Sequence, residues 1–268
     1  MSKVLYEKRD RIAYVTINRP EARNAVDPET HELLRSAWED FRDDDSVDVA
    51  ILTGAGDAFC AGADLKTYIP PLVREHHPGG GEEYLERGFG GLTRGLHRIH
   101  KPVIAAVNGW ALAGGLELAL ACDIRIASER ALFGSFEARR GYHHGDGGIV
   151  RLVNTCGTGL ALEMLLTAEP VDAERALRAN LVSRVVPHDE LIEQAELTAR
   201  QILRNSQRAV RSAKETILDM VGRPLDDQLR IEALNAYACI DPEETLERLQ
   251  RFYDKRDAGR AGSHETPL

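Results

Sequence analysis

The chain has 268 residues, of which 43% are hydrophobic and 29% are charged, and its formal net charge is -9. This composition is typical of a globular protein with one large domain, or with one domain and an appended subdomain. The negative charge disfavours a general binder of nucleic acids or acidic membranes. The N-terminal residues lack the apolar region of a signal peptide, and no run approaches the length of a membrane span. We therefore expect a cytoplasmic protein.

The cysteines show neither a paired C-x-x-C arrangement nor any metal-ligand spacing. They are Cys60, Cys122, Cys156 and Cys239. Free thiols in a reducing compartment fit this pattern, and we expect no metal. A glycine-bearing turn at 54–59 resembles a dinucleotide fingerprint, but Phe59 stands where the third glycine is needed. P-loop and serine-hydrolase motifs do not occur in the sequence either.

In the N-terminal part, alternating apolar residues predict a β-hairpin from strands at 4–7 and 12–17. Asp27 followed by Pro28 predicts the start of a helix with an apolar face. A buried strand is expected at 49–53. The glycine-bearing segment 58–66 follows it, and then a long irregular stretch reaches Arg94. We expect this stretch to be a mobile lid or pocket roof, because it carries clusters of proline, histidine and glycine.

The central part of the chain runs from Asn108 to Asp123. A helix predicted at 92–99 and a buried strand at 103–107 precede it. Gly114 and Gly115 then open an apolar helix that carries Glu117 in its first turn. These glycines let the backbone pass close to a ligand, and the free N–H groups of a helix start favour negative charge.

The remaining elements alternate strands with helices and then become helical. Strands are expected at 124–127 and 182–186, and helices at 148–155, 158–166, 173–179, 189–204, 206–221, 225–237 and 242–255. The alternation predicts an α/β fold with right-handed crossovers. The helical last third is predicted to be an appended subdomain that packs against another subunit.

Two turns and two carboxylates form a candidate site. The turns at 61–63 and 113–115 each follow a strand, and two N–H groups that converge from separate turns make an oxyanion hole. Glu117 and Glu137 can face one pocket as a general acid and base. The alternative is that one or both are surface carboxylates.

Two further clusters have simpler interpretations. His143, His144 and Asp146 offer part of a metal site, but adjacent histidines on a loop point apart, so solvated or pocket-lining side chains are favoured. A basic stripe could bind phosphates. It consists of Arg200, Arg204, Arg208, Arg211 and Lys214. An ordinary solvated face with partners such as Glu196 is favoured instead.

Four segments in fixed order resemble the crotonase (enoyl-CoA hydratase/isomerase) family. They are NRPEARNA (18–25), AFCAGADLK (58–66), KPVIAAVNGWALAGGLELALACD (101–123) and ANLVSRVVP (179–187). The resemblance covers residues 4–255. It implies a crotonase (ClpP-like) spiral of β-β-α units, with a core at 1–200 and a helical trimerisation subdomain at 201–268. It also implies acyl-CoA thioester substrates, no separate cofactor because coenzyme A is part of the substrate, and a homotrimer or a hexamer of paired trimers.

The resemblance assigns roles by position. The N–H groups of Ala63 and Gly114 would form the oxyanion hole, Glu117 and Glu137 would be the catalytic glutamates, and Gly145 would help to hold the reacting water. The coenzyme A side would be lined by Ala61, Ala63, Asp64, Leu65, Lys66 and Gly114, with Arg23 and Ala25 near the pantetheine and adenine. Two glutamates are typical of hydratases, which add water across the 2,3 double bond of a 2-enoyl-CoA.

The segment after Glu137 departs from an ordinary fatty-acyl hydratase, because it is far more polar. Its acyl-pocket candidates are Arg139, Arg140, Tyr142, His143 and His144. Either the arginines reach a polar acyl group, or they form surface or intersubunit ion pairs. Other crotonase reactions, namely isomerisation or thioester hydrolysis, remain alternatives, as does a non-catalytic RNA-binding relative.

Overall fold

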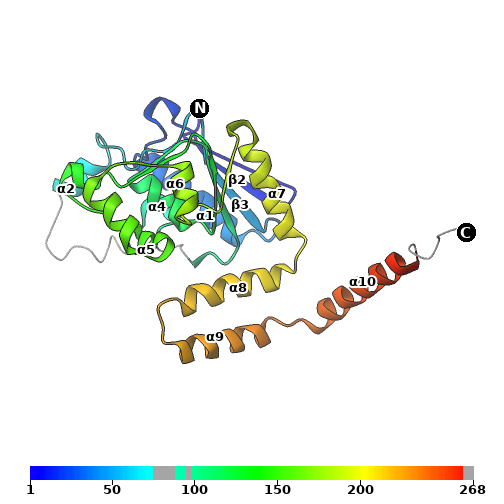
Figure 1. Cartoon of the computed structure of the whole chain (residues 1–268). Helices are drawn as coiled ribbons and strands as arrows, with labels where there is room; N and C mark the ends of the chain where they lie inside the picture. Colours follow the sequence, from blue (N-terminus) through cyan, green and yellow to red (C-terminus); the bar gives the residue numbers. More distant parts are fainter. Residues whose placement is uncertain (75–87, 95–97, 262–268) are drawn as a thin grey trace, which may run out of the picture. The chain divides into compact units, whose positions relative to one another are not determined.

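The computed structural model describes residues 1–74, 88–94 and 98–261, with side chains described up to residue 254 (Figure 1). The chain divides into two compact units, residues 1–210 and 211–268. Residues 75–87 of the predicted lid, including His76, His77 and the glycines at 79–81, lie outside the described residues.

A six-stranded sheet forms the centre of the first unit, in the order β1-β2-β3-β5-β7-β10. Its strands are β1 (Val4–Arg9), β2 (Ile12–Ile17), β3 (Val49–Gly54), β5 (Val103–Val107), β7 (Ile124–Ser128) and β10 (Arg184–Val186). The first two strands pair antiparallel, which confirms the predicted hairpin, and all other neighbours pair in parallel. Parallel neighbours require long crossover connections, and here these connections carry the second sheet and the helices.

The second sheet has four strands in the order β4-β6-β8-β9. They are β4 (Ala58–Cys60), β6 (Trp110–Leu112), β8 (Leu132–Gly134) and β9 (Val171–Asp172). Three successive pairs, β3 and β4, β5 and β6, and β7 and β8, each give one strand to each sheet. This repetition is the predicted α/β spiral of β-β-α units, and it brings the loops that follow β4, β6 and β8 side by side.

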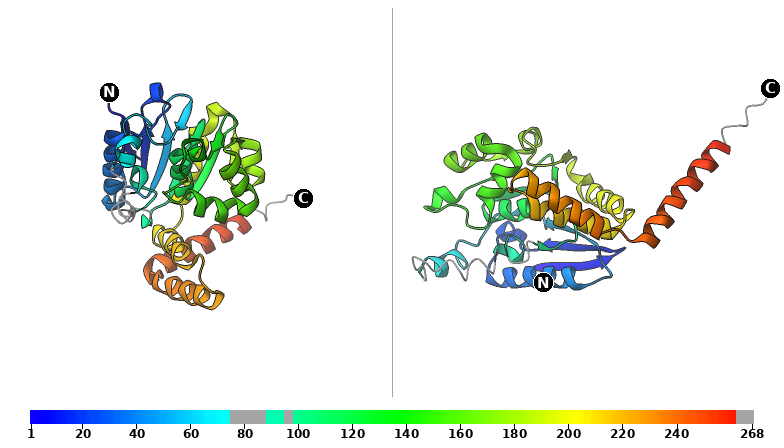
Figure 2. Two further views of the ribbon diagram at one scale, coloured as in Figure 1. Left: turned by 90° about the vertical axis from the view of Figure 1, so that its left-hand side faces the viewer. Right: turned by 90° about the horizontal axis from the view of Figure 1, so that it is seen from below.

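Two helices cover opposite faces of the large sheet, as the two views of Figure 2 show. On one face, α1 (Pro28–Asp43) packs Leu34, Trp38 and Phe41 into the larger core. On the other face, α7 (Leu191–Leu203) packs against β3, β5 and β7. Neighbouring strand residues such as Leu52 and Ile51 belong to the two different cores, because side chains alternate across a strand.

The first unit holds four further α-helices and several 3-10 turns among its described residues. The helices are α2 (Ile69–Arg74), α4 (Gly114–Ala121), α5 (Gly148–Thr167) and α6 (Ala173–Arg178), and the turns are Pro20–Ala22, Phe89–Gly91, Glu137–Arg140 and His188–Glu190. The start of α1 is as predicted, since the Asp27 side chain accepts a hydrogen bond from the Thr30 amide at 2.8 Å.

One helix prediction was wrong where it can be checked. The helix expected at 92–99 is absent at 92–94, which form a turn and a bend, and residues 95–97 lie outside the described part. Tertiary contacts hold this segment instead: the Thr93 hydroxyl donates to Asp146 at 3.1 Å, and the Thr93 carbonyl accepts from Arg151 at 2.8 Å.

Helix α5 is interrupted where the sequence predicted a break. Gly157 has φ of 76° and ψ of 168°, so the helical geometry stops and restarts there. Gly148–Thr167 has the length and composition of a membrane span, with 20 residues and a mean hydropathy of 1.4. The sequence alone predicted no membrane span, and the helical geometry of this segment is interrupted at Gly157.

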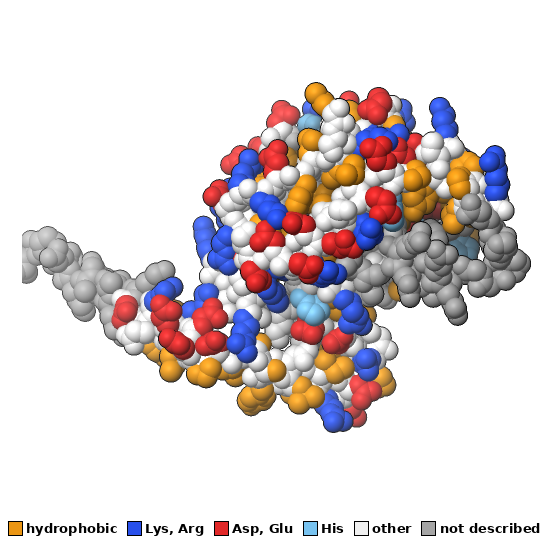
Figure 3. Space-filling model, turned by 180° about the vertical axis from the view of Figure 1, so that it is seen from behind, with side chains coloured by type: hydrophobic (Ala, Val, Ile, Leu, Met, Phe, Trp, Pro, Cys, Tyr) orange, Lys and Arg blue, Asp and Glu red, His pale blue; other side chains and the backbone are white. Residues whose placement is uncertain are grey.

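The second unit consists of helices. It contains the end of α8 (Gln207–Met220), then α9 (Leu225–Ala238) and α10 (Pro242–Ala261). Many apolar side chains in it are exposed, namely Ile217, Val221, Leu225, Leu229, Leu234, Tyr237, Ile240, Leu246, Leu249, Phe252 and Tyr253. Orange side chains along these helices are visible in Figure 3. The trimerisation role of this subdomain stays a prediction.

Candidate active site

A sharp turn before α4 sets the backbone of the site. Ala113 has φ of 52° and ψ of -124°, which is the conformation of the first central residue of a type II′ turn and is usually taken by glycine. Its amide donates to the Gly134 carbonyl at 2.8 Å, which fixes the turn against β8. The next residue, Gly114, is the first of α4, so its N–H has no acceptor within the helix.

The two glycines that open α4 are required by close packing. A Cβ on Gly115 would lie 2.0 Å from the Cys60 carbonyl oxygen, and a Cβ on Gly114 would lie 2.6 Å from the Phe89 ring. The helix start therefore sits directly against the end of β4. A side chain at Gly115 would require the backbone to move, and a side chain at Gly114 would displace the Phe89 ring.

The turn after β4 approaches the same place. A Cβ on Gly62 would lie 3.0 Å from the Ala113 side chain and 3.1 Å from the Gly114 nitrogen. Val26 and Ala63 form a parallel β-bridge. Its two hydrogen bonds run from the Val26 amide to the Gly62 carbonyl and from the Asp64 amide to the Val26 carbonyl. The Ala63 amide therefore takes no part in this bridge. The two turns that the sequence nominated for an oxyanion hole thus lie next to each other.

Glu117 is buried one turn into α4 and is held by two backbone amides. Its Oε1 accepts hydrogen bonds from the nitrogens of Asp146 at 2.8 Å and Gly148 at 2.9 Å. These amides belong to the loop before α5, so the carboxylate ties α4 to that loop. Glu117 is not a surface carboxylate, because its residue is only 4% exposed.

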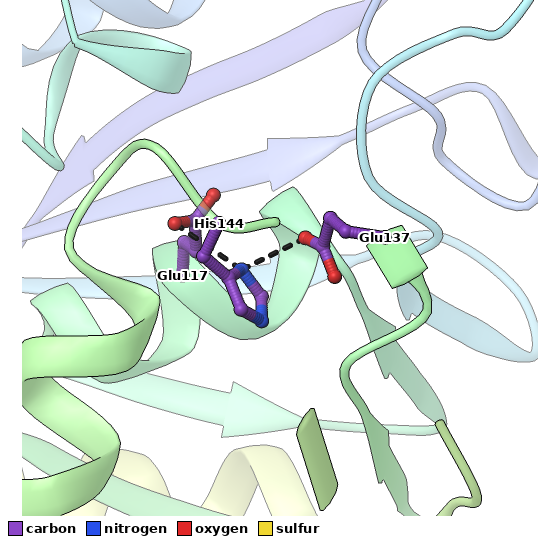
Figure 4. Close-up of side chains that lie close together, drawn as sticks. All are labelled: Glu117, Glu137 and His144. Carbon is purple, nitrogen blue, oxygen red and sulfur yellow. Dashed lines mark ion pairs between the residues drawn. The ribbon is translucent and has the colours of Figure 1, made fainter. Parts of the chain in front are cut away.

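Glu137 is equally buried, at 4% exposure, and it begins the 3-10 turn after β8. The side chain of His144 lies between the two carboxylates (Figure 4). Its Nδ1 is 2.8 Å from Glu137 Oε1 and 3.2 Å from Glu117 Oε1. On the other edge of the ring, Nε2 lies 2.7 Å from the hydroxyl of Ser135.

The electrostatics of this cluster favour a protonated imidazole. Burial lowers the pKa of His144, but the contacts with Glu117 and Glu137 outweigh it and raise the pKa to about 9. Neither contact of Nδ1 has the direction of a linear hydrogen bond, so the attraction is that of an ion pair with both carboxylates. The distances carry this conclusion, since Coulomb attraction depends little on the N–H angle.

The same three side chains are also the one group with metal-ligand spacing among the described residues. Their ligand atoms lie within 4.8 Å of one another. A metal needs a neutral imidazole, whereas the raised pKa of His144 favours the imidazolium. Glu117, Glu137 and His144 form an ion-pair cluster in this structure. That the cluster holds no metal stays a prediction. Asp146, which the sequence had grouped with the histidines, is turned to other partners.

Asp146 fastens the loop of His144 to the segment around Phe89. Its Oδ1 accepts hydrogen bonds from the Phe89 amide at 2.9 Å and from the Thr93 hydroxyl at 3.1 Å. Arg151 donates to the Asp146 carbonyl at 2.9 Å and to the Thr93 carbonyl at 2.8 Å. The Gly145 carbonyl accepts from Arg94, and the predicted water-holding role of Gly145 stays a prediction.

Unlike His144, the other polar acyl-pocket candidates after Glu137 are exposed. The guanidinium of Arg139 is 4.3 Å from the Phe136 ring and 2.9 Å from Glu169, which supports the ion-pair alternative for this arginine. Arg140, Tyr142 and His143 are exposed. His143 and His144 do point apart, as expected of adjacent histidines on a loop.

The residues predicted to bind coenzyme A lie in or near the loop that follows β4. Arg23 lies over the Trp110 ring at 5.4 Å, and its carbonyl accepts from the Ala61 amide at 3.0 Å. Asp64 pairs with Arg19 at 3.1 Å and accepts from the Lys66 amide at 2.9 Å. Ala25 is half-buried, whereas Leu65 and Lys66 are exposed and free to meet a ligand from solvent.

The sequence did not predict the roles of several residues that shape the site. Asn24 is buried and donates to the carbonyls of Ala55 and Ala58 at 2.8 Å and 2.6 Å, which fastens the 18–25 loop beside β4. The contacts of Ser135 with His144 and of Asp146 with Phe89 and Thr93 form only when the chain folds.

Comparison with known proteins agrees with this architecture. The model of the family described as enoyl-CoA hydratase/isomerase matches residues 7–260. A crotonyl-CoA hydratase of Syntrophomonas wolfei is 36% identical over 95% of this chain and 96% of its own. An (E)-benzylidenesuccinyl-CoA hydratase of Thauera aromatica is 37% identical over 94% of this chain and 96% of its own. The crystal structure of an enoyl-CoA hydratase from Mycobacterium tuberculosis has a TM-score of 0.85, 34% identity, and coverage of 95% and 97%.

The chain belongs to the crotonase, or enoyl-CoA hydratase/isomerase, family. The fold and the order of motifs that the sequence predicted are thereby confirmed, and an acyl-CoA substrate follows from the family.

Proposed function

We propose that this protein is an enoyl-CoA hydratase-type lyase, which adds water across the 2,3 double bond of a 2-enoyl-CoA. The observation that carries the proposal is the pair of buried glutamates, Glu117 and Glu137, beside two converging amide-bearing turns. Hydration needs two proton-transfer groups, because a proton must leave the water while the α-carbon gains one. Similar hydratases, each with its own acyl group in its name, support this reaction class.

In the proposed mechanism, the amides of Ala63 and Gly114 bind the thioester carbonyl oxygen. Negative charge develops on this oxygen as the enolate forms, so donors that are already in place lower the barrier. The loss of one such donor typically costs about 3–4 kcal/mol. One glutamate takes a proton from water as the hydroxyl bonds to the β-carbon, and a proton is delivered to the α-carbon.

A panel of enoyl-CoA esters tests the proposal, with turnover followed as loss of the conjugated thioester absorbance. Hydration of at least one ester supports a hydratase. Isomerised or hydrolysed products without hydration would instead identify another reaction of the family.

The same panel of esters tests which acyl group the protein prefers. The polar segment after Glu137 suggests a polar or otherwise specialised acyl chain, for which the exposed Arg140 remains a candidate contact. Carboxylate- and hydroxyl-bearing esters are compared with straight chains, and a higher kcat/KM for the polar esters is expected. Comparable kcat/KM on straight-chain crotonyl- to decenoyl-CoA would contradict this preference.

A further inference from the structure

His144 occupies a fixed position between the two glutamates. Its side chain is 0% exposed. The ring is confined by the start of α5, since a Cβ on Gly148 would lie 2.5 Å from both Cγ and Nδ1 of the imidazole. On the opposite side, Ser135 lies 2.7 Å from Nε2 and donates to Glu137 Oε2 at 3.4 Å. The ring therefore presents one edge to Ser135 and the other to both carboxylates.

The contacts of Ser135 indicate which protons the ring carries. The hydroxyl has a single proton, which it directs to Glu137, so it accepts at its oxygen from Nε2–H. Nδ1 faces two carboxylates that are acceptors when ionised. Both ring nitrogens thus face acceptors, which is the arrangement of an imidazolium.

After one hydration by two glutamates, the protonation states of the two carboxyl groups have changed. The glutamate that acted as the base is protonated, and the glutamate that acted as the acid has given its proton to the substrate. Before the next turnover, a proton must pass from one glutamate to the other. In this structure, a single nitrogen lies within 3.2 Å of both carboxylates.

We propose that His144 is a third proton-transfer residue of this site, which relays a proton through Nδ1 from Glu117 to Glu137. The inference rests on the proposed hydratase function. His144 gives its Nδ1 proton to Glu137, and Glu137 protonates the α-carbon. Glu117 takes a proton from the water whose oxygen bonds to the β-carbon, and then returns it to Nδ1. One water is consumed, and both glutamates and the imidazolium regain their starting charges.

Several charged or titratable groups lie on the elements around the relay. They are Glu117 on α4, Glu137 and Tyr142 after β8, Asp146 on the loop, Arg151 on α5, and Arg94 beside Gly145. The two glutamates are in contact with the imidazole, so they outweigh the more distant arginines.

The first test replaces His144 by Asn, which keeps an N–H donor near the Nδ1 position but does not titrate. Because general acid–base transfer contributes about 10²–10⁴-fold, we expect His144→Asn to lower kcat at least about 10²-fold, with KM much less affected. His188→Asn is the matched control, since His188 contacts Ser128 and lies outside the cluster. A His144→Asn kcat within about twofold of the wild type would overturn the relay.

The pH profile separates a relay from a merely structural role. Wild-type kcat should fall as the pH rises through about 9, where the imidazolium is lost. His144→Asn should lack this alkaline decline, and a variant that is slow but keeps the wild-type profile would overturn the relay. If His144→Asn does not fold, Ser135→Ala keeps the imidazole but removes the acceptor of Nε2–H. The decline should then move to lower pH, and an unmoved decline would contradict the proposal.

The wild-type assay distinguishes the two proposals. A wild-type protein that hydrates no ester of the panel contradicts the hydratase function, and the relay with it. Wild-type turnover combined with an unaltered pH profile in His144→Asn overturns the relay alone.

Discussion

At the scale of single residues, one histidine decides the charge of the site. Glu117 and Glu137 lie close enough to repel each other, and the imidazolium of His144 between them offsets that repulsion. Buried charges persist only when they are paired, and here the pairing involves groups from α4, from the turn after β8 and from the loop before α5. The cluster therefore contributes both to proton transfer and to holding three elements together.

The pairing predicts a pH-dependent stability. The folded pKa of His144, about 9, lies above its ordinary value of 6.5, so the stabilisation is fully present below pH 6.5 and is lost as the pH rises through 9. The difference amounts to about 3 kcal/mol at most. Urea unfolding of the wild type should show this loss between these pH values, whereas His144→Asn should not. Parallel pH curves for the two proteins would contradict the pairing.

At the scale of elements, the site is built from starts of helices and ends of strands. Ala113 stands in a backbone conformation that favours glycine, so the turn into α4 holds strain of about 1–3 kcal/mol. An alanine at this position therefore has a conformational cost that a glycine would not have.

Replacement of this alanine by glycine should relieve that strain. We expect Ala113→Gly to stabilise the protein by about 1 kcal/mol, after the greater entropy of glycine in the unfolded chain is subtracted. Thermal unfolding measures the change. Ala111→Gly, two residues earlier in β6, is the control and should destabilise, because that residue lies in a buried strand without positive φ. A lower melting temperature for Ala113→Gly would contradict the strain.

Much of the architecture at this scale was predictable. The hairpin, the cap at Asp27 and the break near Gly157 follow from local patterns of polarity, proline and glycine. Glu117 was found because it follows the glycine pair at a helix start. His144 was expected to be a solvated or pocket-lining side chain, because its contacts with the two glutamates form only when the loop before α5 packs against α4. No periodicity in the sequence reports such a long-range approach.

At the scale of the whole molecule, exposed apolar side chains predict an assembly. Phe252 is 59% exposed, and many other apolar residues of α9 and α10 are exposed as well. Apolar surface of this extent is typical of subunit interfaces. We propose that the protein forms trimers or hexamers, with these helices at the interfaces.

Light scattering after gel filtration measures the assembly. The chain mass is 29.7 kDa, and a threefold or sixfold multiple is expected. Phe252→Ala should shift the population toward smaller species, whereas Gln250→Ala, on the same helix, should not. A monomeric wild type at micromolar concentration would contradict the proposed interface.

The central claim is that Glu117 and Glu137 together carry out hydration. The most direct measurement is kcat of Glu117→Gln and Glu137→Gln on an ester that the wild type hydrates, with Glu163→Gln as a control at an exposed carboxylate paired with Arg175. Each site variant should lose about 10²–10⁴-fold in kcat, and the control should match the wild type. Hydration by Glu117→Gln or Glu137→Gln at a rate close to that of the wild type would contradict the two-glutamate mechanism.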